Sequence, residues 1–244
     1  MTSSDYGDED SAQRYDAACA DMFAPEILGP AVDVLAEYAG AGRAQEFAIG
    51  TGRVGIPLRE RGIDVVGIEL SEPMVAALHR KAPDFHVAVG DMATTRVDGE
   101  FSLVYLVFNT IANLRTQAEQ VECFRNAARN PSLGGRFVIE LWVPGIRRFP
   151  PGAAAVPFDV MCEHAGLDSY DMATQQGTSH HYTRQEDDTY RRGESNFRYI
   201  WPAECDLMAQ LAGLVLEMRA ADWVGTPLTG DSPSHVPVWR KPMA

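Results

Sequence analysis

Gln45-Glu46-Phe47-Ala48-Ile49-Gly50-Thr51-Gly52-Arg53 joins a short apolar run to two closely spaced glycines. Because glycine lacks a Cβ atom, such a turn lets the backbone approach a ligand closely, and the helix that follows begins with exposed N–H groups. A second apolar run, residues 64–69, ends in the carboxylate of Glu69. At the carboxyl edge of a parallel sheet, that carboxylate can accept hydrogen bonds from both hydroxyls of a ribose. The two segments predict a site for a nucleoside cofactor.

The glycine-rich turn by itself fits two kinds of cofactor. Residues 50–55 satisfy G-x-G-x-x-G, the fingerprint of dinucleotide-binding enzymes, and an acidic residue follows at about the expected distance. This motif is weak on its own. An NAD(P)-dependent oxidoreductase therefore stays open as an interpretation of residues 50–55.

Three further segments follow in the chain. They are the Gly-Asp-Met segment at Val89-Gly90-Asp91-Met92, the continuous apolar run of residues 101–110, and the Gly-Gly turn with its following strand at residues 133–140. Together with the first two segments they resemble, in order and over most of the chain, the class I S-adenosylmethionine-dependent methyltransferases. Two positions depart from the family pattern, because Ala48 replaces the usual first glycine and proline appears earlier than usual, at Pro131.

This resemblance implies S-adenosylmethionine as the cofactor and a small molecule, of natural-product or sugar type, as the acceptor at O or N. Methyl transfer would proceed by in-line displacement. In the family, the acid at Glu69 binds the ribose and the aspartate at Asp91 meets the adenine amino group, while a tyrosine like Tyr15 closes over the carboxylate end of the cofactor. The implied cofactor-binding residues are Tyr15, Glu46, Ala48, Gly50, Gly52, Glu69, Leu70, Met74, Asp91, Met92 and Val107.

The charge of the chain also favours this cofactor over a dinucleotide. The net charge is -13, and the glycine-rich loop offers a single cation, Arg53. Such a surface suits a sulfonium cation better than a dianionic pyrophosphate. Ala48 gives slight support to a further alternative, a homologue that binds the cofactor without methylating anything.

Composition excludes several other classes of function. Because phosphate binding requires a basic stripe that an acidic chain lacks, we expect no nucleic-acid partner. No run of eighteen apolar residues occurs, and residues 1–10 are acidic where a signal peptide would be basic, so we expect a cytoplasmic protein with no membrane partner. No H-E-x-x-H motif or paired cysteine cluster is present, and we expect no metal. A homodimer is compatible with the sequence.

The pattern of apolar runs predicts a doubly wound α/β fold with a mostly parallel, seven-stranded sheet. Residues 1–143 would form N-terminal helices and the cofactor-binding core, with strands near 44–49, 64–69, 85–89, 101–107 and 135–142. A Pro- and Gly-rich break opens residues 144–200, which alternate like antiparallel strands. In the family, an insertion at this place forms a lid over the acceptor. Residues 201–244 would return as a helix and the last two strands.

Candidates for acid–base chemistry lie in the inserted segment and after the fourth strand. His180 and His181 are adjacent. On a strand their side chains point to opposite faces, so at most one faces the pocket. Asn109 follows the fourth strand, where the family places polar residues toward the acceptor. We therefore expect His181 or His180, with Asn109, to act on the acceptor, and the sequence does not choose between the two histidines.

Overall fold

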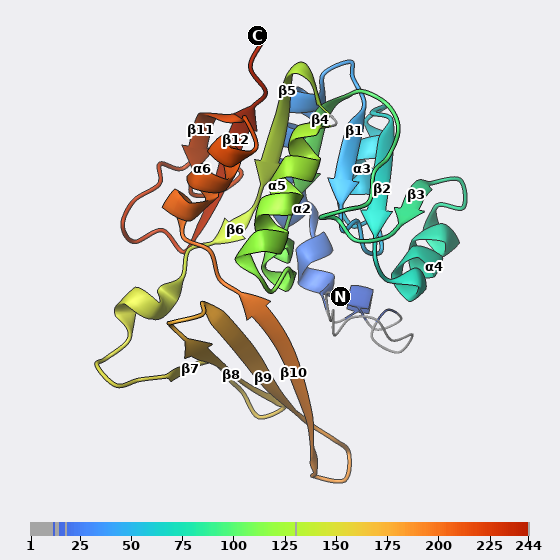
Figure 1. The fold of residues 1–244 in the computed structure, drawn as a ribbon. Helices are drawn as coiled ribbons and strands as arrows, with labels where there is room; N and C mark the ends of the chain where they lie inside the picture. The colour runs from blue at the N-terminus through green and yellow to red at the C-terminus, as the bar shows by residue number, and fades with distance from the viewer. Residues whose placement is uncertain (1–11, 13–14, 18, 130, 244) are drawn as a thin grey trace.

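The computed structural model describes residues 12, 15–17, 19–129 and 131–243, which form an α/β fold with one large and one small sheet (Figure 1). The large sheet has the order β11-β12-β5-β4-β1-β2-β3, with β6 attached to β12. Strands β1 to β5 are parallel, and β12 is antiparallel to both of its neighbours, which confirms the expected mostly parallel, seven-stranded core. The strands are β1 (Ala44–Phe47), β2 (Val65–Glu69), β3 (His86–Val89), β4 (Phe101–Leu106), β5 (Pro131–Ile139), β6 (Leu141–Trp142), β11 (Val215–Ala220) and β12 (Ser234–Arg240).

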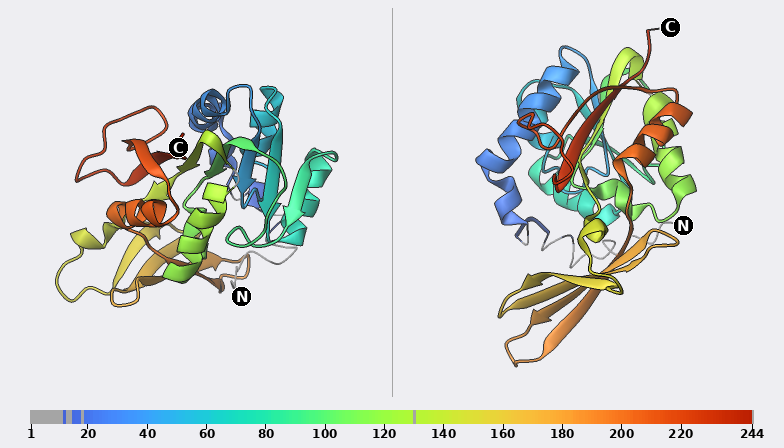
Figure 2. Two further views of the ribbon diagram at one scale, coloured as in Figure 1. Left: turned by 45° about the horizontal axis from the view of Figure 1, so that its top comes forward. Right: turned by 90° about the vertical axis from the view of Figure 1, so that its left-hand side faces the viewer.

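Helices cover both faces of this sheet, as a doubly wound fold requires (Figure 2). Leu35, Leu58 and Leu78 come from three helices and share one buried apolar cluster with strand residues. Phe124 and Met208 come from two others and belong to a second cluster. The helices are α2 (Pro25–Ala39), α3 (Gly55–Glu60) and α4 (Glu72–Lys81) in the first group and α5 (Gln117–Arg129) and α6 (Pro202–Leu211) in the second, with 3-10 turns η1 (Ala20–Phe23), η2 (Thr110–Asn113) and η3 (Gly145–Arg148).

Two strands differ from the sequence-based expectation by more than one residue. β1 ends at Phe47 because Ala48 has a φ of 52°, which leaves the extended conformation. The strand expected at 135–142 is longer and is split, since β5 begins at Pro131, opposite Phe101, and β6 is a separate piece that pairs with β12.

The inserted segment forms a second, antiparallel sheet with the order β10-β9-β8-β7. Figure 1 shows it beyond the carboxyl ends of the parallel strands, where a cofactor and an acceptor would meet. Its strands are β7 (Ala155–Val160), β8 (His164–Asp171), β9 (Gln176–Arg184) and β10 (Tyr190–Arg198).

A buried ion pair joins this sheet to the core. Arg198, at the end of β10, is 4% exposed and donates through Nη2 to Oε1 of Glu204 in α6 at 2.7 Å. Its guanidinium also donates to the side-chain carbonyls of Gln120 and Gln175. Because an uncompensated buried charge is costly, these partners hold the arginine and the sheet that carries it in one position.

None of the described helices combines the length and apolar composition that a bilayer crossing requires. Residues 1–10, whose acidic character entered the expectation of a cytoplasmic protein, lie outside the described part of the chain.

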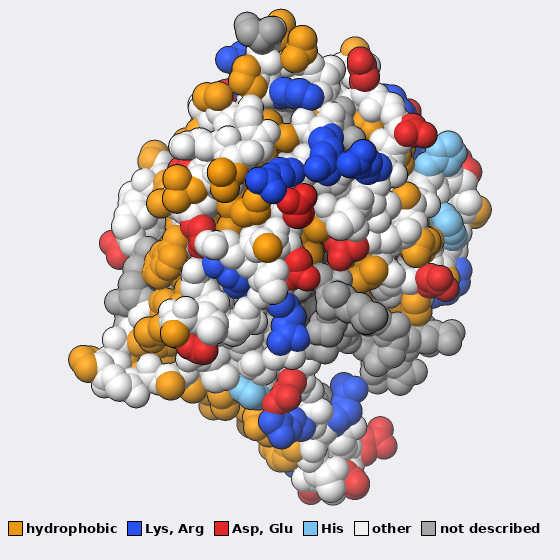
Figure 3. Space-filling model, in the orientation of Figure 1, with side chains coloured by type: hydrophobic (Ala, Val, Ile, Leu, Met, Phe, Trp, Pro, Cys, Tyr) orange, Lys and Arg blue, Asp and Glu red, His pale blue; other side chains and the backbone are white. Residues whose placement is uncertain are grey.

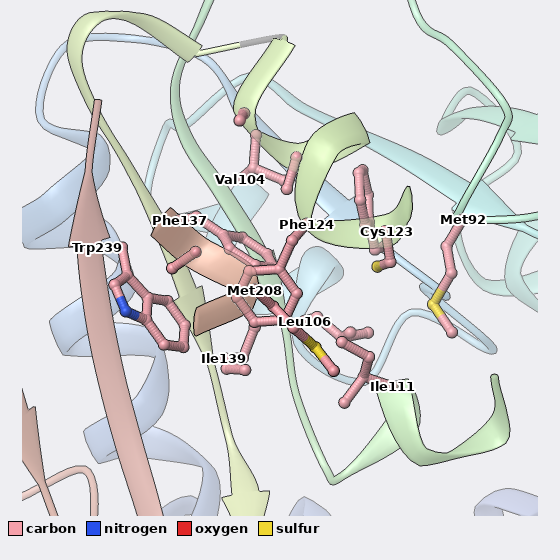
Figure 4. Close-up of a cluster of buried hydrophobic side chains, with 14 of the residues drawn as sticks. Met92, Val104, Leu106, Ile111, Cys123, Phe124, Phe137, Ile139, Met208 and Trp239 are labelled. Carbon is pink, nitrogen blue, oxygen red and sulfur yellow. The ribbon is translucent and has the colours of Figure 1, made fainter. Parts of the chain in front are cut away.

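Aromatic packing holds β5 and β12 against α5 (Figure 4). The ring of Phe124 lies 5.3 Å from that of Phe137 and 5.2 Å from that of Trp239, in edge-on contacts, and all three side chains are buried. Edge-on aromatic pairs add to the stabilisation that comes from burying their apolar area. This cluster therefore anchors the C-terminal hairpin to the parallel sheet.

Truncation of this cluster tests its contribution. Phe124→Ala should lower the free energy of unfolding by about 3–5 kcal/mol, because it removes buried contacts and leaves a cavity. Leu207→Ala is the control, since Leu207 lies on the exposed side of α6, where Figure 3 shows hydrophobic side chains at the surface. It should change the free energy by no more than about 0.5 kcal/mol. Urea denaturation of the three proteins measures both values, and equal losses would contradict this account of the core.

Candidate active site

A cavity of about 550 Å³ lies between the carboxyl edge of the large sheet and the antiparallel sheet. Its walls come from the loops after β1, β2, β3 and β4 on one side and from one face of β7 to β10 on the other. The lining residues are Tyr15, Ala48, Gly50, Glu69, Leu70, Met74, Gly90, Asp91, Met92, Phe108, Asn109, Thr110, Ala112, Asn113, Leu114 and Trp142 from the core, and Phe158, Asp168, Ser179, His181, Ser195 and Phe197 from the antiparallel sheet.

The glycine-rich loop after β1 has a left-handed backbone. Ala48, Gly50 and Gly52 have φ values of 52°, 58° and 84°. A Cβ at Gly50 would meet no atom within 4 Å, whereas a Cβ at Gly52 would lie 2.9 Å from Ile56. Gly50 therefore leaves open space beside the cavity, and Gly52 allows the loop to pack on α3. Ala48 adopts the conformation that suits the family's glycine, at a cost of about 1–2 kcal/mol.

Glu69 connects this loop to the start of α4. Its Oε2 accepts a hydrogen bond from N of Gly50 at 2.8 Å, and its Oε1 accepts one from N of Ser71 at 2.8 Å. The side chain is 8% exposed. Burial raises the pKa of this carboxyl, and the backbone donors oppose the rise because they stabilise the charged form. An ionised carboxylate has lone pairs beyond those used by these two donors, so Glu69 can also accept hydrogen bonds from the hydroxyl groups of a ligand.

Asp91 and its neighbours form the rest of this end of the cavity. Oδ1 of Asp91 accepts a hydrogen bond from N of Ala93 at 2.7 Å, which fixes the carboxylate at the rim. Leu70, Met74 and Met92 supply apolar wall beside it. A carboxylate that suits a ribose, a second acid and an apolar slot together fit an adenosine, and the open space at Gly50 leaves room for the group attached to it.

The opposite wall carries a different set of polar groups. Asp168 accepts hydrogen bonds from the hydroxyls of Ser179, at 2.5 Å, and Tyr170, at 3.0 Å. Burial lowers the pKa of His181, and the neighbouring His164 lowers it too, while Asp168 acts in the opposite direction. The neutral imidazole is therefore favoured, and it can accept a proton from a molecule in the cavity.

Asn109 lies where the two walls meet. Asn109 has a φ value of 56°, and Phe108, which precedes it, has a φ value of 57°. Oδ1 of Asn109 accepts a hydrogen bond from N of Trp142 at 3.2 Å, and the rings of Phe108 and Trp142 are in edge-on contact. Two consecutive left-handed residues are unfavourable and are held by these neighbours, as is common beside ligand sites.

Comparison with known proteins assigns the family. Residues 45–135 match the family described as a methyltransferase domain. The whole structure is similar to that of the CcbJ methyltransferase from Streptomyces caelestis, with 31% sequence identity, coverage of 92% of this chain and 96% of that chain, and a TM-score of 0.81. The chain belongs to the class I S-adenosylmethionine-dependent methyltransferases.

Two curated relatives of this methyltransferase are named for the amino sugar or the terminus that they methylate. The dTDP-3-amino-3,4,6-trideoxy-alpha-D-glucopyranose N,N-dimethyltransferase of Streptomyces venezuelae is 33% identical over 32% of this chain and 33% of that enzyme. The cypemycin N-terminal methyltransferase of Streptomyces sp is 27% identical over 77% of this chain and 78% of that enzyme. The chain spans 33% of the length of the dimethyltransferase and 37% of the length of another curated relative that it matches. These relatives support the methyltransferase interpretation of residues 50–55, and not the NAD(P)-dependent oxidoreductase.

Most of the residues selected from the sequence of this methyltransferase line the cavity. The set comprises Tyr15, Ala48, Gly50, Glu69, Leu70, Met74, Asp91, Met92, Asn109 and His181. Four others are not among the lining residues: Gly52, which packs on α3, and Glu46, Val107 and His180. Val107 is buried in the apolar core. His180 is on the far face of β9, where its ring contacts Glu194 and Ser169 at 2.9 Å each.

Glu46 is buried beneath the glycine-rich loop and is 2% exposed. Its Oε2 accepts a hydrogen bond from the hydroxyl of Tyr105 at 2.8 Å, and N of Gly55 also donates to this carboxyl. Burial raises the pKa of Glu46 to about 8, although both hydrogen bonds lower it. The geometry makes it a support for the loop and not part of the cavity wall.

Phe158, Asp168 and Ser195 are lining residues that the sequence did not single out. They belong to β7, β8 and β10, and they lie on the face of the small sheet that carries His181. Asp168 and Ser195 are both paired with Ser179 of β9. The alternation within β9 predicted that Ser179 and His181 share a face. The cross-strand partners require the register, for which the sequence has no local signal.

The pKa of Glu46 predicts a pH-dependent stability. Its folded-state pKa, about 8, lies above the ordinary value of 4.5, so the wild-type chain should lose stability as the pH rises between these two values. Glu46→Gln has no titrating group and retains an acceptor for Tyr105. The free energy of unfolding of the wild type should therefore fall relative to Glu46→Gln, by at most about 1.4 kcal/mol per pH unit. Urea denaturation across this range tests it, with exposed Glu60→Gln as the control, and a constant difference would refute the raised pKa.

Proposed function

We propose that this methyltransferase transfers a methyl group from S-adenosylmethionine to an amine nitrogen of a small natural-product or amino-sugar acceptor. The observation that carries the proposal is the cavity itself. Glu69 and Asp91 line an end that fits an adenosine, and Asp168 and His181 line the opposite wall. One cavity thus offers separate places for a cofactor and for an acceptor.

The residues at the first end fit the cofactor. Glu69 would bind the ribose hydroxyls, Asp91 the adenine amino group, and Leu70, Met74 and Met92 the apolar faces of the base. Backbone at Gly50 leaves space for the amino-acid part, on the side where Tyr15 reaches the cavity. When bound, S-adenosylmethionine supplies an activated methyl group on a cationic sulfur. The aromatic rings of Phe108 and Trp142 suit a cation in this cavity.

The opposite wall favours an amine over a hydroxyl group. The carboxylate of Asp168 attracts an ammonium, and His181 in its neutral form can take the proton that the nitrogen must lose before it attacks. A free amine is nucleophilic enough without a strong base, so the remaining task of the chain is to orient the acceptor and exclude water. The relatives that methylate an amino sugar and a peptide N-terminus support nitrogen as the target.

Acceptor assays test the proposal directly. With S-adenosylmethionine, amino sugars and cyclic amines should gain one CH₂ unit of mass per transfer, and their hydroxyl isosteres should not react. Asp168→Asn should raise KM for the amine roughly 10-fold or more, since a hydrogen bond to a charged group contributes about 1.5–3 kcal/mol. Asp171→Asn is the control, because Asp171 is exposed and outside the cavity. Equal methylation of the hydroxyl isosteres, measured by mass spectrometry, would exclude an amine-specific site.

Loss of the Glu69 carboxylate tests the cofactor end separately. Glu69→Ala should weaken S-adenosylhomocysteine binding by about 1–3 kcal/mol, because buried ribose hydroxyls and the N–H groups of Gly50 and Ser71 lose their acceptor. Calorimetric titration measures the affinity, and Glu60→Ala, a carboxylate removed from the exposed end of α3, should leave it unchanged. An unaltered affinity in Glu69→Ala would remove the ribose assignment.

A further inference from the structure

Three side chains of the antiparallel sheet form a hydrogen-bonded chain that ends at the cavity. Oδ2 of Asp159 lies 2.6 Å from Nδ1 of His164. Nε2 of His164 lies 3.1 Å from Nδ1 of His181. Because His181 uses Nδ1 in this contact, its Nε2 is the ring nitrogen left for a molecule in the cavity that it lines. We call Asp159, His164 and His181 the histidine chain.

One irregularity of the sheet brings these residues together. The pairing of β7 with β8 shifts between Pro157 and Asp159, so Phe158 is the extra residue of a β-bulge. A bulge redirects side chains, and here Asp159 reaches His164 while the ring of Phe158 lies 5.3 Å from that of His181. Phe158 occupies the space above Gly166, where a Cβ would come within 2.2 Å of its ring. The aromatic ring thus packs against the imidazole that the hydrogen bonds orient.

The order of donors along the histidine chain follows from its carboxylate end. An ionised Asp159 only accepts, so Nδ1 of His164 must carry a proton. When His164 carries only this proton, its Nε2 accepts a hydrogen bond and His181 donates from Nδ1. The lone pair of His181 is thereby placed on Nε2. Outer partners commonly fix a histidine tautomer in this way.

We propose that Asp159 and His164 are positioning residues that hold His181 with its proton on Nδ1 and its Nε2 ready to accept the acceptor's proton. In this step an N–H bond of the acceptor ammonium breaks, its electron pair remains on nitrogen, and the proton forms an N–H bond at Nε2 of His181. The resulting imidazolium donates from Nδ1 to His164, whose own partner is the carboxylate of Asp159. After the product leaves, the proton passes to water.

The charged groups around His181 are consistent with this role. His164 and Asp168 face it from β8, His180 precedes it in β9, and Glu194 of β10 contacts His180 on the other face. The side chains of His164 and Asp159 are 28% and 32% exposed, so water reaches the outer end of the histidine chain. The histidine chain therefore connects the cavity to solvent, as a proton-accepting site requires. Among the residues that the structure describes, no group of three or more potential ligands is arranged to hold a metal ion.

The tautomer of His181 can be measured without knowing the acceptor. In the full chain labelled with ¹⁵N-histidine, long-range ¹H–¹⁵N correlation separates ring nitrogens that carry a proton from those that do not. The chain has six histidines, and loss of one signal set in His181→Phe assigns the residue. We expect His181 to carry its proton on Nδ1 in the wild type, whereas an isolated imidazole favours Nε2. His164→Phe and Asp159→Asn should both shift the population toward Nε2–H.

His180→Phe is the matched control, because it changes the adjacent histidine on the opposite face and should leave the tautomer of His181 as in the wild type. Unchanged S-adenosylhomocysteine affinity shows that each variant has folded, and Asp159→Asn keeps the test valid if His164→Phe does not fold. A wild-type His181 protonated on Nε2, or a tautomer unaffected by both variants, would overturn the proposal.

The catalytic part of this inference rests on the proposed amine methylation, and kinetics test it separately. With an amine acceptor, His164→Phe should lower kcat by roughly 100-fold with little change in KM. This loss is at the lower end of the rate contribution of a positioned proton acceptor. If no amine is methylated but the tautomer follows the histidine chain, the proposed function fails and the positioning remains. If methylation occurs at the wild-type rate in His164→Phe, the role in catalysis is refuted.

Discussion

The carboxylate of Glu69 is the constraint on which the cofactor end of this methyltransferase depends. It ends β2, accepts one N–H from the loop after β1 and another from the residue that precedes α4, and so fixes three segments at one point. Without that acceptor, two buried N–H groups would lose their partners, and the loop at Gly50 would lose its tie to the second strand. Burial of the carboxylate raises the energy of its charged form, which the two N–H donors stabilise. In the proposed function, the ribose hydroxyls would donate to the same carboxylate.

Much of the fold was predictable because the apolar runs and helix caps of single segments agree with the parallel sheet that these segments form together. The apolar run of residues 64–69 placed β2 to within one residue. Ser71 accepts from N of Met74 as the N-cap of α4, and Pro73 lies in its first turn. The parallel strands also bring Glu69 and Asp91 to one edge, where the resemblance to the family implied the cofactor. Glu46 was different: its place before the loop resembles the family motif, but its side chain points into the core toward Tyr105.

The acceptor side could be predicted only in part. Alternation along β9 separates His180 from His181, but the choice of face depends on which side of the small sheet meets the core. That side is set by contacts between residues far apart in sequence, such as Arg198 with Gln120. No local sequence signal marks the bulge at Phe158, which brings Asp159 to His164. The contact between these two residues could therefore not be predicted. Long-range register, and not residue type, limited the prediction.

The buried contacts of Arg198 connect two parts of the enzyme, the core and the small antiparallel sheet, which are built from different segments of the chain. Residues that fit the cofactor lie between positions 48 and 92 together with Tyr15, whereas the opposite wall belongs to a sheet built from residues 155–198. The two are connected through β10, where the guanidinium of Arg198, 4% exposed, contacts amide and carboxylate partners. Under the proposed function, substitutions within the small sheet would alter the acceptor wall and leave the residues that fit the methyl donor in place. Acceptor choice would then be a separable module of the fold.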